Sequence, residues 1–261
     1  AGASVSKEFA PIARSQGLFV IDNSSAWRED SDIPLIVPEV NLEDYTLNRL
    51  IANPNCSTIQ AVLPLKALQE AFGIQRVNYS TYQAVSGSGQ KGIQDLYRTQ
   101  NDEEPALYPY NISQTVIPEI DQPLENGYTK EEQKMINETR KILHQPDLPV
   151  SATCVRVPIE NGHGVSVAVQ LQKEFTIEEV KECLSQFPGI QLEDDLAAHK
   201  YPTSILARGT DTVYAGRIRK DTSLENGLLF YTTADNIRKG AAANAVQIAA
   251  ALMQKIVEVA R

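Results

Sequence analysis

The sequence predicts an α/β fold divided between two lobes, and three observations support this prediction. A short apolar run at residues 18–21 follows a helical segment and has the composition of a buried parallel strand. From residue 77 onward, segments that alternate apolar and polar residues are separated by helices with clear start signals. The chain has 261 residues, of which 42% are hydrophobic, so it can bury a large core.

The first strand lies between a helix and a polar loop. Ser4 is a candidate N-cap for a helix that runs to about Gln16, and the strand at residues 18–21 follows it. The loop at residues 22–28 comes after the carboxyl end of that strand, where open α/β sheets bind their ligands. Arg28 in this loop is therefore a candidate anion contact, with a solvated surface arginine as an equal alternative.

Cys56 stands where a loop turns into a helix. From residue 57 apolar side chains recur at helical spacing until Gly73 ends the pattern. Free amides and the positive end of the helix dipole favour an anion, so we expect this thiol to ionise more easily than a free cysteine. The alternative is one more buried thiol, which is how we interpret Cys154 and Cys183.

The middle of the chain offers weaker signals. A strand at residues 77–85 leads into the glycine- and serine-rich loop at residues 86–92, whose backbone amides can approach a ligand closely, although most such loops are only flexible turns. Residues 101–127 are polar and contain four prolines, so we expect an extended excursion over the surface.

Two capping boxes open helices in the second half. Thr129 begins a helix to about Leu143, and Thr176 begins one that ends at Gly189. On the first of these helices Glu131 and Lys134 share a face, which by itself indicates an exposed ion pair.

Strands are expected at residues 151–157, 164–171, 212–219 and 228–233, before a last helix from about Ile237 to the C-terminus. Arg156 and His163 flank the turn at residues 158–162, so one hairpin is expected to bring both to a common site. A lone histidine is more often structural or exposed than catalytic.

The charge and the cysteine content exclude several classes of protein. A net charge of −9 argues against nucleic-acid binding, which needs a basic face. No apolar stretch is long enough to span a bilayer, and the first residues are not a signal peptide, so we expect a soluble protein. Three cysteines at irregular spacing form neither a disulfide framework nor a zinc site, and they fit a reducing cytoplasm.

Several motifs together resemble the bacterial aspartate-semialdehyde dehydrogenase family. They include Asn53-Pro54-Asn55-Cys56-Ser57-Thr58, Tyr82-Gln83-Ala84-Val85-Ser86-Gly87, Cys154-Val155-Arg156-Val157-Pro158, Gly162-His163 and Asp235-Asn236-Ile237-Arg238-Lys239-Gly240, with residues 4–8, 22–25 and 37–41. The motifs occur in the family's order and cover essentially the whole chain, which makes the set far more specific than any one of them.

The resemblance implies reduction of L-aspartyl 4-phosphate to L-aspartate 4-semialdehyde by NADPH with release of phosphate, a step toward lysine and diaminopimelate, threonine and methionine. It implies a partial Rossmann-type dinucleotide lobe at residues 1–55 and 237–261. An α+β catalytic and dimerisation domain with a mixed sheet occupies residues 56–236. A cytoplasmic homodimer is expected, which binds a small-molecule substrate and phosphate and neither nucleic acid nor membrane.

The resemblance also assigns roles to residues. Cys56 matches the nucleophile that forms an acyl-thioester, and His163 matches the acid/base. Gln83 matches the residue that contacts substrate beside the cysteine, and Asn55 with nearby amides is suited to steady an oxyanion. For the substrate's charged groups the matches are Arg156 for the carboxylate, Arg28 and Lys134 for the phosphate, and Glu131 for the ammonium. The positions that contact the nicotinamide side of NADP match Ser86, Gly87 and Asn236.

The sequence departs from the family pattern in three places. The family's N-terminal strand, glycine-rich turn and 2′-phosphate contacts are not found, so only part of the cofactor site is expected. The segment at residues 101–127 is shorter than the corresponding segment in the family. Gly164 follows His163 at a position where a serine is common in the family. Two alternatives remain open: a non-catalytic substrate-binding or dimerising fragment, and N-acetylglutamyl-phosphate reductase, whose nucleophile follows a glycine where this chain has Asn55.

Overall fold

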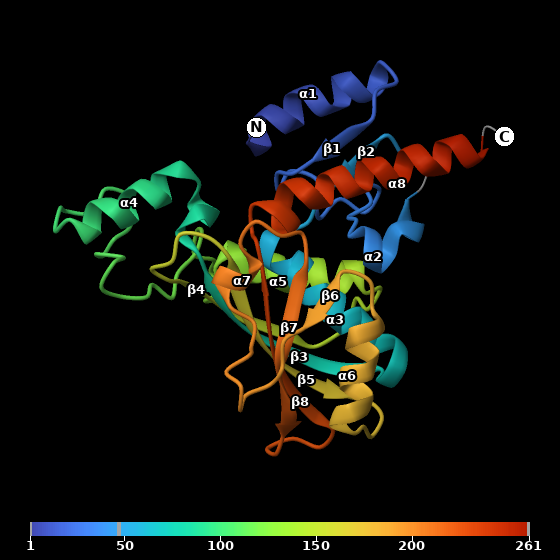
Figure 1. Ribbon diagram of the computed structural model, residues 1–261. Helices are drawn as coiled ribbons and strands as arrows, with labels where there is room; N and C mark the ends of the chain where they lie inside the picture. The colour runs from blue at the N-terminus through green and yellow to red at the C-terminus, as the bar shows by residue number, and fades with distance from the viewer. Residues whose placement is uncertain (1, 46–47, 260–261) are drawn as a thin grey trace.

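The computed structural model describes residues 2–45 and 48–259, and it places them in two lobes (Figure 1). We call the upper one the small lobe. It contains α1 (Ala3–Ser15), β1 (Val20–Asp22), α2 (Pro38–Asn41), β2 (Leu50–Ala52) and α8 (Ala243–Val259). Strands β1 and β2 pair in parallel, as expected for part of a dinucleotide-binding sheet.

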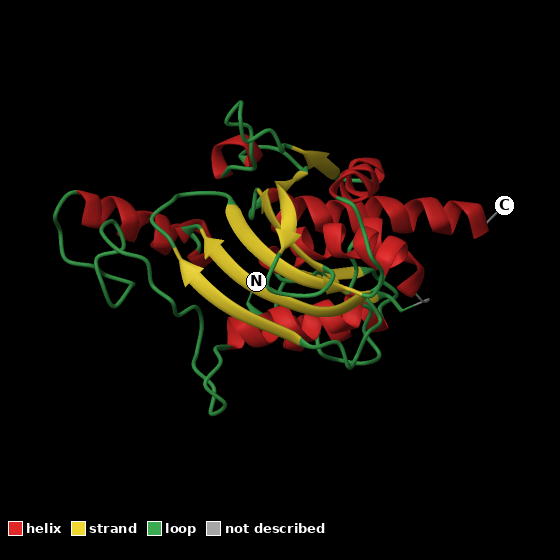
Figure 2. Ribbon diagram, turned by 90° about the horizontal axis from the view of Figure 1, so that it is seen from below, coloured by secondary structure: helices red, strands yellow, loops and turns green. Residues whose placement is uncertain are grey.

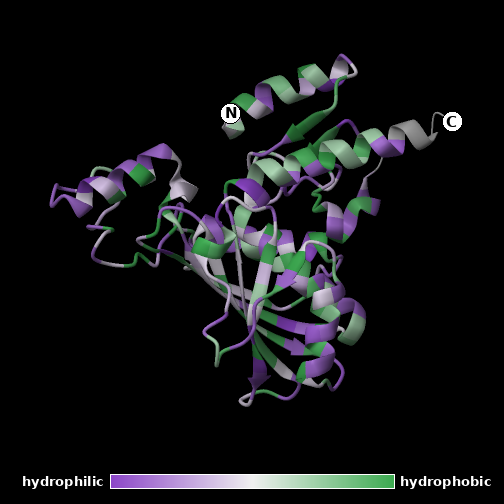
Figure 3. Ribbon diagram, viewed as in Figure 1, coloured by the Kyte–Doolittle hydropathy of each residue, from purple (hydrophilic) through white to green (hydrophobic). Residues whose placement is uncertain are grey.

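The small lobe has its own apolar core. This core consists of Ile36, Ile51, Ile248 and Leu252, so the last helix of the chain packs against segments from its beginning. Hydrophobic residues recur along both α1 and α8 (Figure 3), and Phe9 and Ile12 of α1 are each 55% exposed.

The large lobe is built on a mixed six-stranded sheet with the order β4-β3-β5-β8-β7-β6. Its strands are β3 (Ile74–Gln83), β4 (Val150–Arg156), β5 (His163–Leu171), β6 (Ile190–Leu192), β7 (Val213–Asp221) and β8 (Gly227–Ala234). The pairs β3–β4 and β6–β7 are parallel and the other three are antiparallel. Figure 2 shows these strands curving across the molecule. The predicted fold class is confirmed.

Helices cover one face of this sheet. They are α3 (Cys56–Phe72), α5 (Lys130–Ile142) and α6 (Ile177–Gln186), and their apolar side chains join those of the strands in one core (Figure 1). Along β5 the valines at 165, 167 and 169 point into this core, while the residues between them are less buried. On the other face Tyr82 is 41% exposed.

The prediction that residues 151–171 form a hairpin is wrong. Strand β3 lies between β4 and β5 and hydrogen-bonds to both, so the two strands on either side of the turn are not neighbours. Arg156 and His163 nevertheless stay close, because the end of β4, the end of β3 and the start of β5 lie at the same edge of the sheet.

The helices begin and end near their predicted limits, with physical reasons for the differences. Gly2 rather than Ser4 precedes α1. Helix α6 ends at Gln186 and not at Gly189, because Pro188 forces Phe187 into an extended conformation. The predicted last helix is divided into a π-helical turn, Arg238–Ala242, and α8.

Both predicted capping boxes form, at Thr129 and at Thr176. After α4 (Gln90–Gln100), which extends away from both lobes (Figure 1), residues 101–127 form no helix and no named strand. They return to the large lobe, where Ile117 pairs with Arg156 of β4 and Ile120 joins the core. In the parts of the chain that the structure describes, no helix is both long and apolar enough to cross a membrane.

Candidate active site

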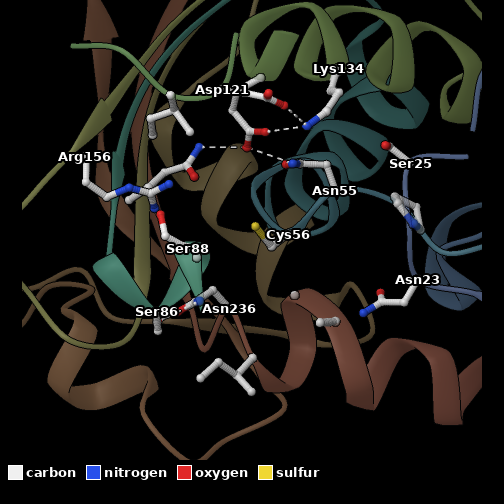
Figure 4. A pocket seen from close by; sticks show the side chains of 18 of the residues that line it. Asn23, Ser25, Asn55, Cys56, Ser86, Ser88, Asp121, Lys134, Arg156 and Asn236 are labelled. Carbon is white, nitrogen blue, oxygen red and sulfur yellow. Dashed lines mark hydrogen bonds and ion pairs between the residues drawn. The ribbon is translucent and has the colours of Figure 1, made fainter. Parts of the chain in front are cut away.

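A pocket of about 530 Å³ lies where the small lobe meets the carboxyl ends of β3 and β4. In Figure 4 the sulfur of Cys56 points toward its centre. Its lining includes the predicted site residues Arg28, Asn55, Cys56, Gln83, Ser86, Gly87, Glu131, Lys134, Arg156 and Asn236. Of the predicted site residues, only His163 is not part of the lining.

Cys56 is the first residue of α3, as predicted. The Asn55 side chain caps the helix, since its Oδ1 accepts hydrogen bonds from the amides of Ser57 (2.9 Å) and Thr58 (3.3 Å). On the opposite side the π-helical turn packs directly on the cysteine. A Cβ added at Gly240 would lie 2.9 Å from the Cys56 Cβ, so this contact requires glycine.

The prediction that Cys56 ionises more easily than a free cysteine is wrong. Burial raises the pKa of the thiol to about 11, and the Glu131 carboxylate adds to this effect. Arg156, Arg28 and the Ser57 amide lower the pKa, but only in part. The helix start is present, yet loss of water outweighs it, so the thiol is protonated at neutral pH.

Glu131 lines the pocket and accepts hydrogen bonds from three donors. Its Oε1 accepts from Asn55 Nδ2 at 2.8 Å and from Gln83 Nε2 at 3.2 Å, and its Oε2 accepts from Lys134 Nζ at 3.2 Å. The side chain of Glu131 is only 7% exposed, so the Glu131–Lys134 pair is not the exposed surface pair of the simpler interpretation.

Lys134 also contacts a carboxylate that sequence reasoning did not select. Its Nζ lies 2.7 Å from Asp121 Oδ2. Burial lowers the pKa of Lys134, but Glu131 and Asp121 outweigh burial and raise it above its ordinary value. The lysine is therefore a stable cation beside the pocket.

The side chains of Arg156 and His163 both hydrogen-bond to the backbone of Ala84. Arg156 Nη1 donates to the Ala84 carbonyl at 2.7 Å, and the Ala84 amide donates to His163 Nδ1 at 3.0 Å. Gly87 lies against both side chains. A Cβ there would be 2.6 Å from Arg156 Nη1 and 3.2 Å from His163 Nε2, so any larger residue would displace them.

The hydrogen bond from the Ala84 amide determines which ring nitrogen of His163 carries the proton. A backbone amide can only donate, so Nδ1 is the acceptor and carries no hydrogen. Burial lowers the pKa of His163 well below its ordinary value, and Arg156 lowers it further, so the ring is neutral. The single proton therefore lies on Nε2, which is buried and has no partner among the described residues.

The predicted nicotinamide contacts meet at another edge of the pocket. Asn236 Nδ2 donates to Ser86 Oγ at 3.0 Å, and Asn236 Oδ1 accepts from the Gly162 amide at 2.9 Å. Gly87 lines the same part of the pocket, and Figure 4 shows Ser86 and Asn236 side by side there.

Arg28 reaches the pocket from the small lobe. The residue is 8% exposed, and its Nη1 and Nη2 bond Glu138 Oε1 and the Asn23 carbonyl, each at 3.1 Å. Arg28, Lys134 and Arg156 thus place three cations around one thiol, a set suited to a small ligand with more than one anionic group.

Comparisons with known proteins agree with this geometry. The family described as "Semialdehyde dehydrogenase, dimerisation domain" matches residues 65–239, and "Semialdehyde dehydrogenase, NAD binding domain" matches residues 1–47. Aspartate-semialdehyde dehydrogenase of Aquifex aeolicus is 50% identical over 98% of this chain and 78% of its own length. The chain belongs to the aspartate-semialdehyde dehydrogenase family.

Two solved structures extend the comparison. Aspartate semialdehyde dehydrogenase II from Vibrio cholerae, complexed with ASA, has a TM-score of 0.92 and 44% identity, covering 97% of this chain and 78% of that one. The enzyme from Candida albicans with NADP has a TM-score of 0.76 and 27% identity, covering 96% and 75%. This chain is thus an enzyme of an oxidoreductase family with a nicotinamide-dinucleotide domain.

The glycine at position 164, where the family resemblance predicts a serine, has a structural reason. A Cβ added at Gly164 would overlap the hydroxyl of Tyr231 on the neighbouring strand β8. Tyr231 in turn packs its ring against Tyr82, with centroids 6.2 Å apart. A tyrosine hydroxyl therefore fills the place beside position 164.

Sequence reasoning missed four residues that shape the site: Asp121, Glu138, Ser25 and Gly240. Glu138 could have been found, because it lies four residues after Lys134 and so shares its helical face. Asp121 lies in the irregular excursion, where no periodicity marks it. Within the described ranges, 2–45 and 48–259, no group of three His, Cys, Asp or Glu could hold a metal ion.

The raised pKa of Cys56 gives a direct prediction. We expect the rate of Cys56 alkylation by iodoacetamide to rise with pH without a plateau below about pH 10, because the thiolate fraction is still increasing. Glu131→Gln removes a carboxylate that raises this pKa, so alkylation at pH 8 becomes several-fold faster. Peptide mass spectrometry assigns the label, and Glu132→Gln, a buried carboxylate on the same helix, is the control. A plateau near pH 7 in the unchanged protein would contradict the prediction.

Proposed function

We propose that this chain catalyses the NADPH-dependent reductive dephosphorylation of L-aspartyl 4-phosphate to L-aspartate 4-semialdehyde. The observation that carries the proposal is Cys56 at the centre of a pocket with three cations and one buried carboxylate. Membership of the aspartate-semialdehyde dehydrogenase family supports the reaction. The ASA and NADP complexes of relatives support the substrate class and the choice of cofactor.

The charges of the pocket fit the charges of the substrate. Arg156 would bind the α-carboxylate through its planar guanidinium, and Glu131 would accept the ammonium. Arg28 and Lys134 would bind the phosphate from the other side of Cys56. Since Asn55, Gln83 and Lys134 already donate to Glu131, the substrate ammonium would replace some of these donors.

In the first step the Cys56 sulfur attacks the acyl carbon, and phosphate leaves to give a thioester. The departing phosphate gains a negative charge and can take up the proton of the thiol. The thiol and the dianionic acyl phosphate therefore give a thioester and a hydrogen phosphate dianion. His163 cannot accept that proton in this conformation, because its Nε2 already carries one. Its suitable role is to donate from Nε2 to the carbonyl oxygen, together with backbone amides at the start of α3 and Asn55.

The second step needs a hydride, which the reduced nicotinamide of NADPH supplies when it is bound. Ser86, Gly87 and Asn236 would hold the nicotinamide end beside the thioester. Reduction of the thioester would leave a hemithioacetal anion, and the Nε2–H group of His163 would stabilise its oxygen before the aldehyde leaves. Cys56 then takes up a proton again.

The proposal includes the organisation of the chain. Residues 1–55 and 237–261 would form the NADP-binding lobe, and residues 56–236 the catalytic and dimerisation domain. The half-exposed face of the sheet, with Tyr82 on it, is suited to pair with a second copy in a homodimer. A cytoplasmic place in lysine, threonine and methionine synthesis is part of the same proposal.

The test is the reverse reaction, with L-aspartate 4-semialdehyde, inorganic phosphate and NADP mixed with the protein and NADPH followed by absorbance. We expect NADPH to form only when phosphate is present, and NADP to support a higher kcat/KM than NAD. Calorimetric titration with NADP accompanies this assay. No detectable NADP binding together with no turnover would favour the non-catalytic alternative.

A further inference from the structure

Glu138 is a buried carboxylate just behind the wall of the pocket. It lies on α5, seven residues after Glu131, and the residue is 2% exposed. Its Oε1 accepts from Arg28 Nη1 at 3.1 Å, and its Oε2 accepts from the Asn55 backbone amide at 2.6 Å. One carboxylate therefore links an arginine of the small lobe to the residue that precedes Cys56.

We propose that Glu138 is a positioning residue that sets the place of Arg28, and with it the bound phosphate, relative to the Cys56 sulfur. The inference rests on the proposed function, because it needs Arg28 to bind the phosphate. It adds a residue that touches neither the substrate nor the cofactor and that acts through Arg28 and Asn55.

Arg28 needs such a partner because an arginine side chain has many rotamers. Glu138 and the Asn23 carbonyl hold the two ends of its guanidinium, each at 3.1 Å. The Nε atom is buried and has no partner in the described part of the chain. The guanidinium is thus held at two points while its residue still lines the pocket.

The second half of the link holds the nucleophile. Asn55 uses its side chain to cap α3 and to bond Glu131, and it uses its backbone amide to bond Glu138. The peptide before Cys56 is therefore fixed by α5 and cannot move without Glu138 moving as well. Attack on the acyl carbon needs the sulfur and the phosphate-bearing acyl group in a defined relation, and this carboxylate contacts the supports of both.

The contacts with Arg28 and with the Asn55 amide need a side chain whose two terminal atoms both accept hydrogen bonds, as the carboxylate of Glu138 does. In Glu138→Gln the side-chain nitrogen would face either the Arg28 guanidinium or the Asn55 amide, and both are donors. Glu138→Asp keeps the charge but is one methylene shorter, so it cannot reach both partners. The two variants separate the need for charge from the need for reach.

The experiment uses inorganic phosphate as the probe and measures how it protects Cys56 from iodoacetamide. Labelling of the Cys56 peptide is followed by mass spectrometry at mildly alkaline pH, so no turnover is required. We expect phosphate to protect the wild-type thiol and the half-protecting concentration to rise at least about tenfold in Glu138→Gln, because a charge-assisted contact that orients Arg28 is lost.

Glu132 provides a matched control on the same helix. Its carboxylate is also buried, but it bonds the amides of Thr129 and Cys154, away from the pocket. Glu132→Gln is expected to lower the melting temperature while leaving the half-protecting phosphate concentration unchanged. A role of Glu138 in folding alone would make the two variants behave alike.

A double-mutant comparison with Arg28→Lys tests the route of the effect. If Glu138 acts through Arg28, adding Glu138→Gln to Arg28→Lys changes phosphate protection by less than about twofold. Wild-type protection by phosphate in Glu138→Gln would overturn the inference alone, whereas absence of protection in the wild type would overturn the proposed phosphate site with it. If Glu138→Gln does not fold, the same measurement on Glu138→Asp decides, with wild-type protection again counting against the inference.

Discussion

Replacing Cys56 by alanine should abolish turnover, by at least about 10⁴-fold in kcat, while the protein still binds substrate and phosphate. The sulfur forms the covalent bond on which the whole proposed reaction depends, and no second thiol lines the pocket in the described chain. Arg28, Lys134 and Arg156 are unchanged in this variant, so the binding charges remain.

The measurement pairs initial rates with calorimetric binding of phosphate. Cys183→Ala is the control, since Cys183 is half-buried on α6 and its sulfur donates only to the Ala67 carbonyl. Retention of kcat within a factor of ten of the wild type in Cys56→Ala would show that the reaction does not pass through this thioester.

Replacing His163 by asparagine should lower kcat more than replacing it by glutamine. Asparagine places an acceptor near the position of Nδ1, so His163→Asn can keep the bond from the Ala84 amide but offers no donor at Nε2. Glutamine places an N–H near the position of Nε2. If His163 acts as a donor, we expect about a 10²- to 10⁴-fold loss of kcat in His163→Asn and a distinctly smaller loss in His163→Gln.

The comparison separates a donor from a base. A base at this position must be able to gain a proton, and neither amide can, so equal loss in both variants would contradict the donor role. Nitrogen NMR of labelled histidine in the wild type provides the independent measurement, with the expected signal that of a neutral ring protonated at Nε2. The pH profile of kcat should then lack an inflection from His163 near pH 6.5, since the pKa of that ring is lowered well below this value.

The sequence was sufficient for features that depend on neighbouring residues. The capping boxes at Thr129 and Thr176 need only a threonine and a glutamate three residues later, and both form. The start of α3 at Cys56 follows from Asn55 as its cap and from the apolar spacing behind it. The roles of the candidate site residues came from the resemblance to the family, and ten of the eleven residues line one pocket.

Features that depend on distant contacts could not be predicted in this way. A turn between two strands indicates a hairpin, but here β3, which comes from much earlier in the chain, pairs with β4 and β5 and separates them. The acidity of Cys56 failed for a similar reason. A helix start is visible in sequence, whereas the thiol pKa is raised by burial, to which the π-helical turn contributes, and by the charge of the distant Glu131 carboxylate.

The contact between Gly240 and Cys56 also has a consequence for folding. The two residues touch, yet nearly the whole large lobe lies between them in sequence. Contacts of such long range are entropically costly to close early, so they form after local helices and hairpins. The wall behind the nucleophile is therefore expected to be among the last features that a refolding chain completes. Activity should return more slowly than helical circular dichroism, and the accessible Cys56 thiol should mark chains in which folding is still incomplete.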